Sequence, residues 1–126
     1  MPITFVVESR GPLVRTTYSG RVTFRDVMEY VDQLIDRNLL VIPQLIDARA
    51  ATLALSEEET RQVSDRLASL RLQYGRAPVA FVAGNAVSYT VAADYGDRGA
   101  GGIPTFSIFA EVEAAEVWIA LSRPHT

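Results

Sequence analysis

The chain has 126 residues and a net charge of −3, and apolar and charged residues make up 48% and 21% of it. This composition is typical of a globular domain rather than a disordered chain, and the length suits one domain with one hydrophobic core. A protein that neutralises many phosphates needs a basic surface, so the acidic balance disfavours nucleic acid as a partner. The absence of cysteine excludes disulfides, thiolate zinc sites and cysteine nucleophiles.

No targeting or membrane-spanning segment is expected. Residues 1–4 lead into an apolar stretch without a basic region or a cleavage site, and no apolar run reaches about eighteen residues. We therefore expect a soluble, cytoplasmic protein. Its only histidine is the penultimate residue, His125, which excludes a Ser-His-Asp triad and a histidine-based metal cluster. We predict no catalytic residues, no metal and no cofactor.

The first part of the chain predicts a β-hairpin followed by a helix. β-branched and aromatic runs at 3–8 and 13–18 flank a Ser-Arg-Gly-Pro connection, and Ser19-Gly20 is expected to end the second strand. Apolar residues at helical spacing predict a helix over about 23–37 that begins at Thr23 as N-cap.

The middle of the chain predicts two strands around a second helix. The run 44–47 indicates a short buried strand that ends at Asp47. Ser56 followed by Glu59 forms a capping box at the start of a helix that Gly75 stops. The apolar run 78–83 suits a strand that is covered on both faces.

The last part predicts a third helix over about 85–95, a glycine-rich loop at 96–102, a strand at 105–109 and a helix at 111–122. The resulting order, β-β-α-β-α-β-α-β-α, indicates an α/β domain. Its sheet should be mixed but mainly parallel, with about five strands, an N-terminal hairpin and four helices.

Six segments, taken in this order, resemble the SpoIIAA-like family of small STAS/SEC14-like domains over nearly the whole chain. They are residues 1–3 (MPI), 18–20 (YSG), Thr23, 44–49 (QLIDAR), 83–89 (AGNAVSY) and 109–119 (FAEVEAAEVWI). The resemblance implies one domain over 1–126 and a non-enzymatic role. Two behaviours are associated with such folds: phosphoserine-controlled partner switching, as in anti-sigma-factor antagonists, and capture of a lipophilic small molecule, as in SEC14-type proteins.

The chain departs from both patterns. In the antagonists a phosphorylated serine follows the strand that ends in aspartate, whereas Asp47 is followed here by Ala-Arg-Ala-Ala-Thr. Thr52 and Ser56 are the only nearby hydroxyls, which puts the phospho-switch in doubt. The SEC14 proteins are also much longer, and this chain is too small to enclose a whole phospholipid.

Two corners of the predicted sheet carry candidate binding residues. Asp47 and Arg49 should lie at the carboxyl end of a parallel strand, where open α/β sheets bind ligands; alternatively, Asp47 caps a turn and Arg49 is its solvated partner. At the second corner, Asn85 with Ser88 and Tyr89 offers backbone amides to an anion, or forms a turn and an N-cap. Thr52 completes this ligand- or partner-binding set.

Three further features have simpler interpretations beside the functional one. Ser56 is a candidate phosphoacceptor, although the three glutamates after it would repel a phosphate and favour a plain cap. The loop 96–102 lacks the spacing of a dinucleotide or phosphate loop, which favours a connection. A set of aromatic and sulfur-containing side chains lines an apolar pocket or simply forms core: Met28, Tyr30, Tyr89, Tyr95, Phe106 and Trp118.

The sequence thus favours a regulatory or binding module for a partner protein or a small apolar or anionic ligand, acting near Asp47 and Asn85. The alternatives are a homodimeric structural interaction protein and, less favoured, a small-molecule enzyme that uses Asp47, Arg49 or Tyr89. A pocket between the first two helices and the sheet would distinguish ligand capture from contact with a partner alone.

Overall fold

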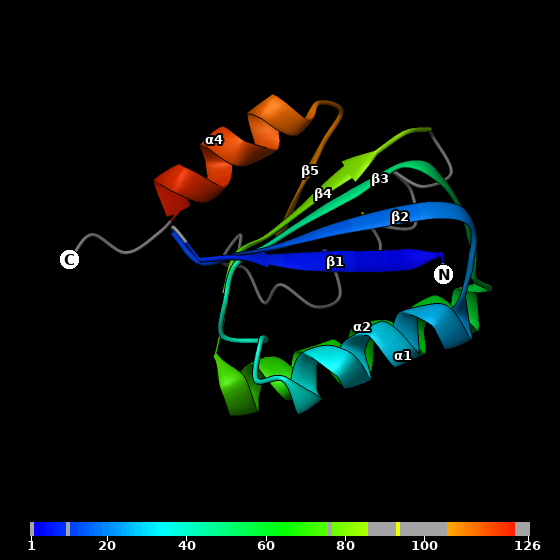
Figure 1. Ribbon diagram of the computed structural model, residues 1–126. Helices are drawn as coiled ribbons and strands as arrows, with labels where there is room; N and C mark the ends of the chain where they lie inside the picture. Colours follow the sequence, from blue (N-terminus) through cyan, green and yellow to red (C-terminus); the bar gives the residue numbers. More distant parts are fainter. Residues whose placement is uncertain (1, 10, 76, 86–92, 94–105, 123–126) are drawn as a thin grey trace.

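The computed structural model describes residues 2–9, 11–75, 77–85, 93 and 106–122. The predicted third helix, apart from Asn85 and Ala93, the loop 96–102 and His125 lie outside the described residues. The described elements follow the predicted order (Figure 1). They are β1 (Ile3–Glu8), β2 (Leu13–Thr23), α1 (Phe24–Asp36), β3 (Gln44–Ala54), α2 (Glu57–Tyr74), β4 (Val79–Ala83), β5 (Phe106–Phe109) and α4 (Val112–Ser122).

The strands form one five-stranded sheet in the order β1-β2-β3-β4-β5. β1 is antiparallel to β2, with Ile3 opposite Tyr18 and Glu8 opposite Leu13. The pairs β2–β3, β3–β4 and β4–β5 are parallel. The N-terminal hairpin and the mixed, mainly parallel sheet are therefore confirmed.

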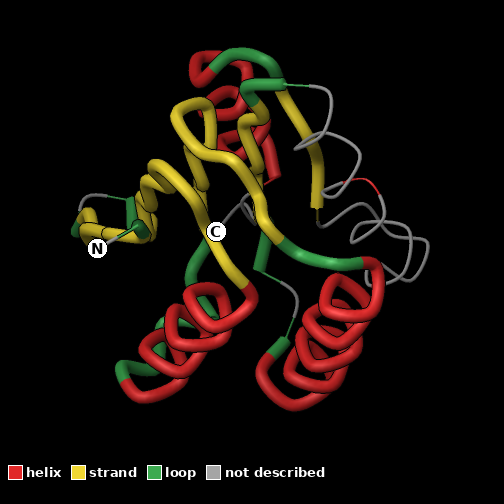
Figure 2. Tube along the Cα trace, turned by 90° about the vertical axis from the view of Figure 1, so that its right-hand side faces the viewer, coloured by secondary structure: helices red, strands yellow, loops and turns green. Residues whose placement is uncertain are grey.

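The helices lie on both faces of this sheet. The connections from β2 to β3 and from β3 to β4 step across the sheet in the same direction, so right-handed crossovers put α1 and α2 on one face. α4 covers the opposite face (Figures 1 and 2). Alternate strand residues therefore enter two different cores. In β3, Ile46 packs beneath α1 and α2, whereas its neighbour Leu45 packs beneath α4.

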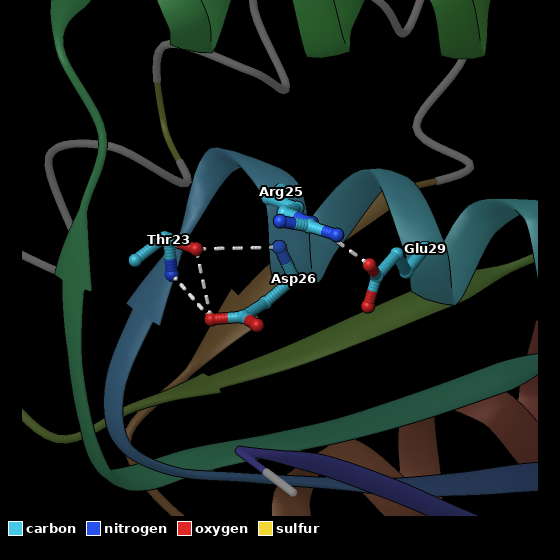
Figure 3. A network of polar contacts seen from close by, with 4 residues as sticks. All are labelled: Thr23, Arg25, Asp26 and Glu29. Atoms are coloured by element: carbon cyan, nitrogen blue, oxygen red, sulfur yellow. Dashed lines mark hydrogen bonds and ion pairs between the residues drawn. The ribbon is translucent and has the colours of Figure 1, made fainter.

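α1 begins at the predicted N-cap, and β2 leads into it directly. The Thr23 hydroxyl accepts a hydrogen bond from the Asp26 backbone N–H at 3.3 Å, and the Asp26 carboxylate accepts one from the Thr23 backbone N–H at 2.9 Å (Figure 3). Arg25 and Glu29, one turn apart, add an exposed ion pair at 3.1 Å. Because Thr23 is both the last strand residue and the helix cap, the position of α1 is tied to the register of β2.

Two predicted strand ends are wrong. β2 continues through Ser19-Gly20 to Thr23, and β3 continues past Asp47 to Ala54. Both strands are longer than predicted because each gives the other backbone hydrogen-bond partners. This pairing runs from Ser19 opposite Ala50 to Thr23 opposite Ala54. Where the prediction placed a strand end, the register instead shifts: β3 advances from Asp47 to Ala50 while β2 advances from Thr17 to Ser19. β3 therefore carries a bulge at this point.

The predicted capping box of α2 is confirmed. The Glu59 backbone N–H donates to the Ser56 hydroxyl at 3.1 Å, and the Ser56 backbone N–H donates to the Glu59 carboxylate at 2.9 Å. These contacts satisfy two amides that the first turn of a helix otherwise leaves without partners.

We expect Ser56→Ala to lower the free energy of unfolding by about 1 kcal/mol, because it removes the cap of α2. The matched control is Ser69→Ala, the same substitution at an exposed position inside the same helix. There alanine should be neutral or slightly stabilising. Urea denaturation of both variants measures the difference, and equal effects would contradict a capping role for Ser56.

Candidate functional site

The predicted pair Asp47–Arg49 lies on the β3 bulge rather than at the end of the strand. The Arg49 side chain donates to both carboxylate oxygens of Asp47, from Nε and Nη2, at 2.9 Å each. The Arg49 backbone N–H donates to the same carboxylate at 3.1 Å. These bonds from Arg49 hold the pKa of the Asp47 carboxyl below its usual value. Each charge already has its partner, so the pair offers no general base.

The second predicted corner lies next to this pair. The described β3–β4 ladder ends with Ala48 opposite Ala83, and Gly84 then passes against the backbone of Arg49. A Cβ on Gly84 would lie 2.4 Å from the Arg49 carbonyl oxygen, which is closer than any side chain can approach. Asn85 directly follows Gly84 in the chain, so this corner lies beside the bulge.

The other predicted residues do not join this group. Thr52 is exposed on β3, about 16 Å farther along the strand than Asp47 at ~3.3 Å per residue. Ser56 is engaged in its capping box. Ser88 and Tyr89 lie outside the described residues.

A cavity lies on the opposite face, between the sheet and the helices α1 and α2. Its volume is about 110 Å³. Of the described residues that line it, most are apolar. α1 contributes Val27, Tyr30, Val31 and Leu34; α2 contributes Thr60, Val63 and Leu67; the strands and the segment after β3 contribute Tyr18, Gln44, Ile46, Leu53, Leu55, Val79, Phe81 and Phe106. The cavity therefore lies between the first two helices and the sheet, which is where a protein of this kind that captures a ligand is expected to have a pocket.

The aromatic residues predicted to line a pocket divide between the two faces. Tyr30 and Phe106 line the cavity, and Met28 packs against the same core. Trp118 lies on the α4 face, where its ring stands 5.8 Å from that of Phe109. Tyr89 and Tyr95 lie outside the described residues.

Two short polar side chains on the inner face of α2 form hydrogen bonds within the helix, and one of them, Thr60, lines the cavity. Thr60 and Ser64 are buried. Their hydroxyls donate to carbonyl oxygens one turn back in the helix, those of Ser56 at 2.9 Å and of Thr60 at 3.0 Å. Because these hydroxyls need no partner on the sheet, α2 can bury them without larger side chains reaching across.

A buried chain of polar side chains borders the cavity. The hydroxyls of Thr16 and Tyr30 are 2.6 Å apart, and the Tyr30 hydroxyl donates to the Gln44 amide oxygen at 3.0 Å. Burial raises the pKa of the Tyr30 hydroxyl, which therefore stays protonated. The sequence interpretation missed Thr16 and Gln44 as candidate residues. The signal for Gln44 was a glutamine at the start of a strand expected to be buried.

Neither a metal-binding cluster nor a membrane-spanning helix is found among the described residues. No group of three histidine, cysteine, aspartate or glutamate side chains there could hold a metal ion. In the same part of the chain, no helix is long and apolar enough to cross a membrane.

The fold belongs to a known class. The chain is similar in structure to an uncharacterized protein of the DUF3478 family from Shewanella loihica PV-4, which has a SpoIIAA-like fold. The two share 15% identity over 93% of each chain, with a TM-score of 0.64. This chain therefore has a SpoIIAA-like α/β fold, as the sequence resemblance implied. No protein-family model matches the sequence, and no curated protein matches it.

We expect Gly84→Ala to destabilise the protein by about 3 kcal/mol, because its Cβ meets the Arg49 backbone rather than a movable side chain. Gly20→Ala provides the control. Gly20 has φ +65° but nothing within 4 Å of an added Cβ, so its cost should be the conformational one, about 1 kcal/mol. Chemical denaturation compares the two. A Gly84 variant no less stable than the Gly20 variant would contradict the close approach at this corner.

Proposed function

We propose that this protein is a binding module without catalytic activity, and that the cavity beneath α1 and α2 takes up a small, largely apolar molecule. The cavity itself is the observation that carries the proposal. Protein interiors are close-packed and hold few voids larger than a water molecule. A pocket of 110 Å³ lined mainly by apolar side chains gives a ligand a place to bury its own apolar surface, which is favourable by about 25 cal/mol per Å².

The volume limits the size of this ligand. An apolar cavity of about 150 Å³ holds benzene, so a cavity of 110 Å³ suits one small ring or a short branched chain. A whole phospholipid does not fit. Of the two behaviours that the resemblance implied, the proposal is therefore ligand capture, with a ligand much smaller than a lipid.

A partner protein is the second candidate, at the surface formed by Asp47, Arg49 and the Gly84-Asn85 corner. The half-exposed Arg49–Asp47 ion pair at 2.9 Å supports it, because a charged pair at a strand bulge gives a partner a specific polar contact. Thr52, Ser88 and Tyr89 stay candidate contacts of such a partner, and Ser56 stays a candidate phosphoacceptor. Partner binding here and ligand binding in the cavity use opposite faces of the sheet.

We expect benzene to raise the melting temperature of the wild type, because a ligand that binds only the folded state stabilises it. Val63→Phe should abolish this rise, since Val63 lines the cavity and is 8% exposed and a phenyl ring there occupies the same space. The variant itself should be about as stable as the wild type, because its ring fills an existing void. Differential scanning calorimetry with and without benzene measures both effects.

The control variant is Val117→Phe, the same substitution at a 60% exposed position on α4. It should keep the response of the wild type to benzene. A response that survives Val63→Phe would place binding outside the cavity, and a wild type without any response would contradict the proposed function.

The homodimer, which the sequence leaves as an alternative, has its own test. Val117 and Leu121, one turn apart on α4, are 60% and 75% exposed, and their burial would favour self-association. We expect light scattering to show a molar mass that rises toward the dimer with concentration. A monomer at all concentrations would contradict this prediction.

A further inference from the structure

Gln44 holds a fixed position at the edge of the cavity. It is the first residue of β3, and its backbone N–H donates to the Pro78 carbonyl at 2.9 Å. The residue as a whole is 8% exposed. It lines both the main cavity and a void of about 30 Å³ near the end of α2. Its amide is therefore a buried polar group next to unfilled space.

The protons of the polar chain can be assigned one by one. The Tyr30 hydroxyl has a single proton and donates it to the Gln44 amide oxygen. The Thr16 hydroxyl must then donate to Tyr30, across their 2.6 Å contact. The Gln44 amide nitrogen carries two more protons. Among the described residues, none accepts a hydrogen bond from this nitrogen. Buried amide groups without a partner are rare and unfavourable.

The absence of charge among the described lining residues limits which ligands can bind in the cavity. None of the described residues that line the cavity carries a charge. A carboxylate or phosphate that entered would lose its hydration without gaining a cationic partner, which is strongly unfavourable. The acceptor that meets Gln44 must therefore belong to a neutral group.

We propose that the ligand of this cavity is a small, neutral, apolar molecule with a carbonyl or ether oxygen, and that this oxygen accepts a hydrogen bond from the Gln44 side-chain amide. This inference rests on the proposed function, because it specifies the ligand class of the same site. Thr16 and Tyr30 act as positioning residues, because their hydrogen bonds hold the Gln44 amide oxygen and leave its nitrogen for the ligand.

A matched pair of probes tests the proposal. Cyclopentanone and methylenecyclopentane have the same ring and nearly the same size, and differ only in that the carbonyl oxygen of the ketone is a CH₂ group in the alkene. Titration of each into the wild type, followed by NMR, gives the ratio of their two affinities. Gln44→Met replaces the amide with an apolar chain of similar length, so the ratio of ketone to alkene affinity should fall about fivefold, the worth of one hydrogen bond. Comparing ratios cancels the different hydration of the probes.

Gln73→Met is the control, because Gln73 is exposed on α2 and its replacement should leave the ratio unchanged. A second measurement needs no variant. In the ¹⁵N-labelled wild type, the side-chain amide protons of Gln44 should shift with the ketone more than with the alkene.

The outcomes separate the two proposals. If neither probe binds the wild type, the proposed function fails, and the inference fails with it. If both bind, but Gln44→Met leaves the ratio unchanged and the amide signals respond equally to both probes, the cavity function stands and the inference is overturned. In that case Gln44 is satisfied by water alone.

Discussion

β2 and β3 pair in parallel from Val14 opposite Gln44 to Thr23 opposite Ala54, and the other elements take their positions from this ladder. Its last pair makes Thr23 the cap of α1, which directs that helix back over the sheet. Near its first pair, Thr16 and Gln44 lie on the same face as diagonal neighbours, within reach of Tyr30 from α1. A shift of one residue in this register would turn Gln44 toward α4 and break the polar chain.

Features that depend on a few neighbouring residues could be predicted from the sequence. The N-cap at Thr23, the capping box at Ser56, the hairpin and the last helix are of this kind. The ends of β2 and β3 could not be predicted in this way, because Ser19-Gly20 and the polar residues after Ile46 are local turn signals. The partner strand overrides such signals by offering each residue a ladder hydrogen bond, and a bulge absorbs the irregularity.

The candidate sites divide in the same way. That the corner at Gly84 lies beside Asp47 and Arg49 followed from the geometry of parallel strands, although Asp47 lies within its strand and Thr52 lies apart. The cavity could not be predicted, because a void exists only where several side chains from different elements all stop short. Tyr30 and Phe106 were identified as candidate pocket residues. Nothing local to Thr60 or Ser64 shows that their hydroxyls bond to carbonyl oxygens within α2 rather than to the sheet.

The two candidate sites differ in how much their polar groups still have to bind. On the α4 face, Arg49 already gives its donors to Asp47, so a partner there must compete with an existing ion pair in water, where such pairs contribute little. On the other face, Gln44 is buried among described lining residues that carry no charge, where a hydrogen bond is electrostatically stronger and an unmade one is more costly. One strand presents both groups on opposite faces of the sheet. A hydrogen bond from a ligand to Gln44 in the cavity therefore contributes more binding free energy than a contact of a partner with Arg49.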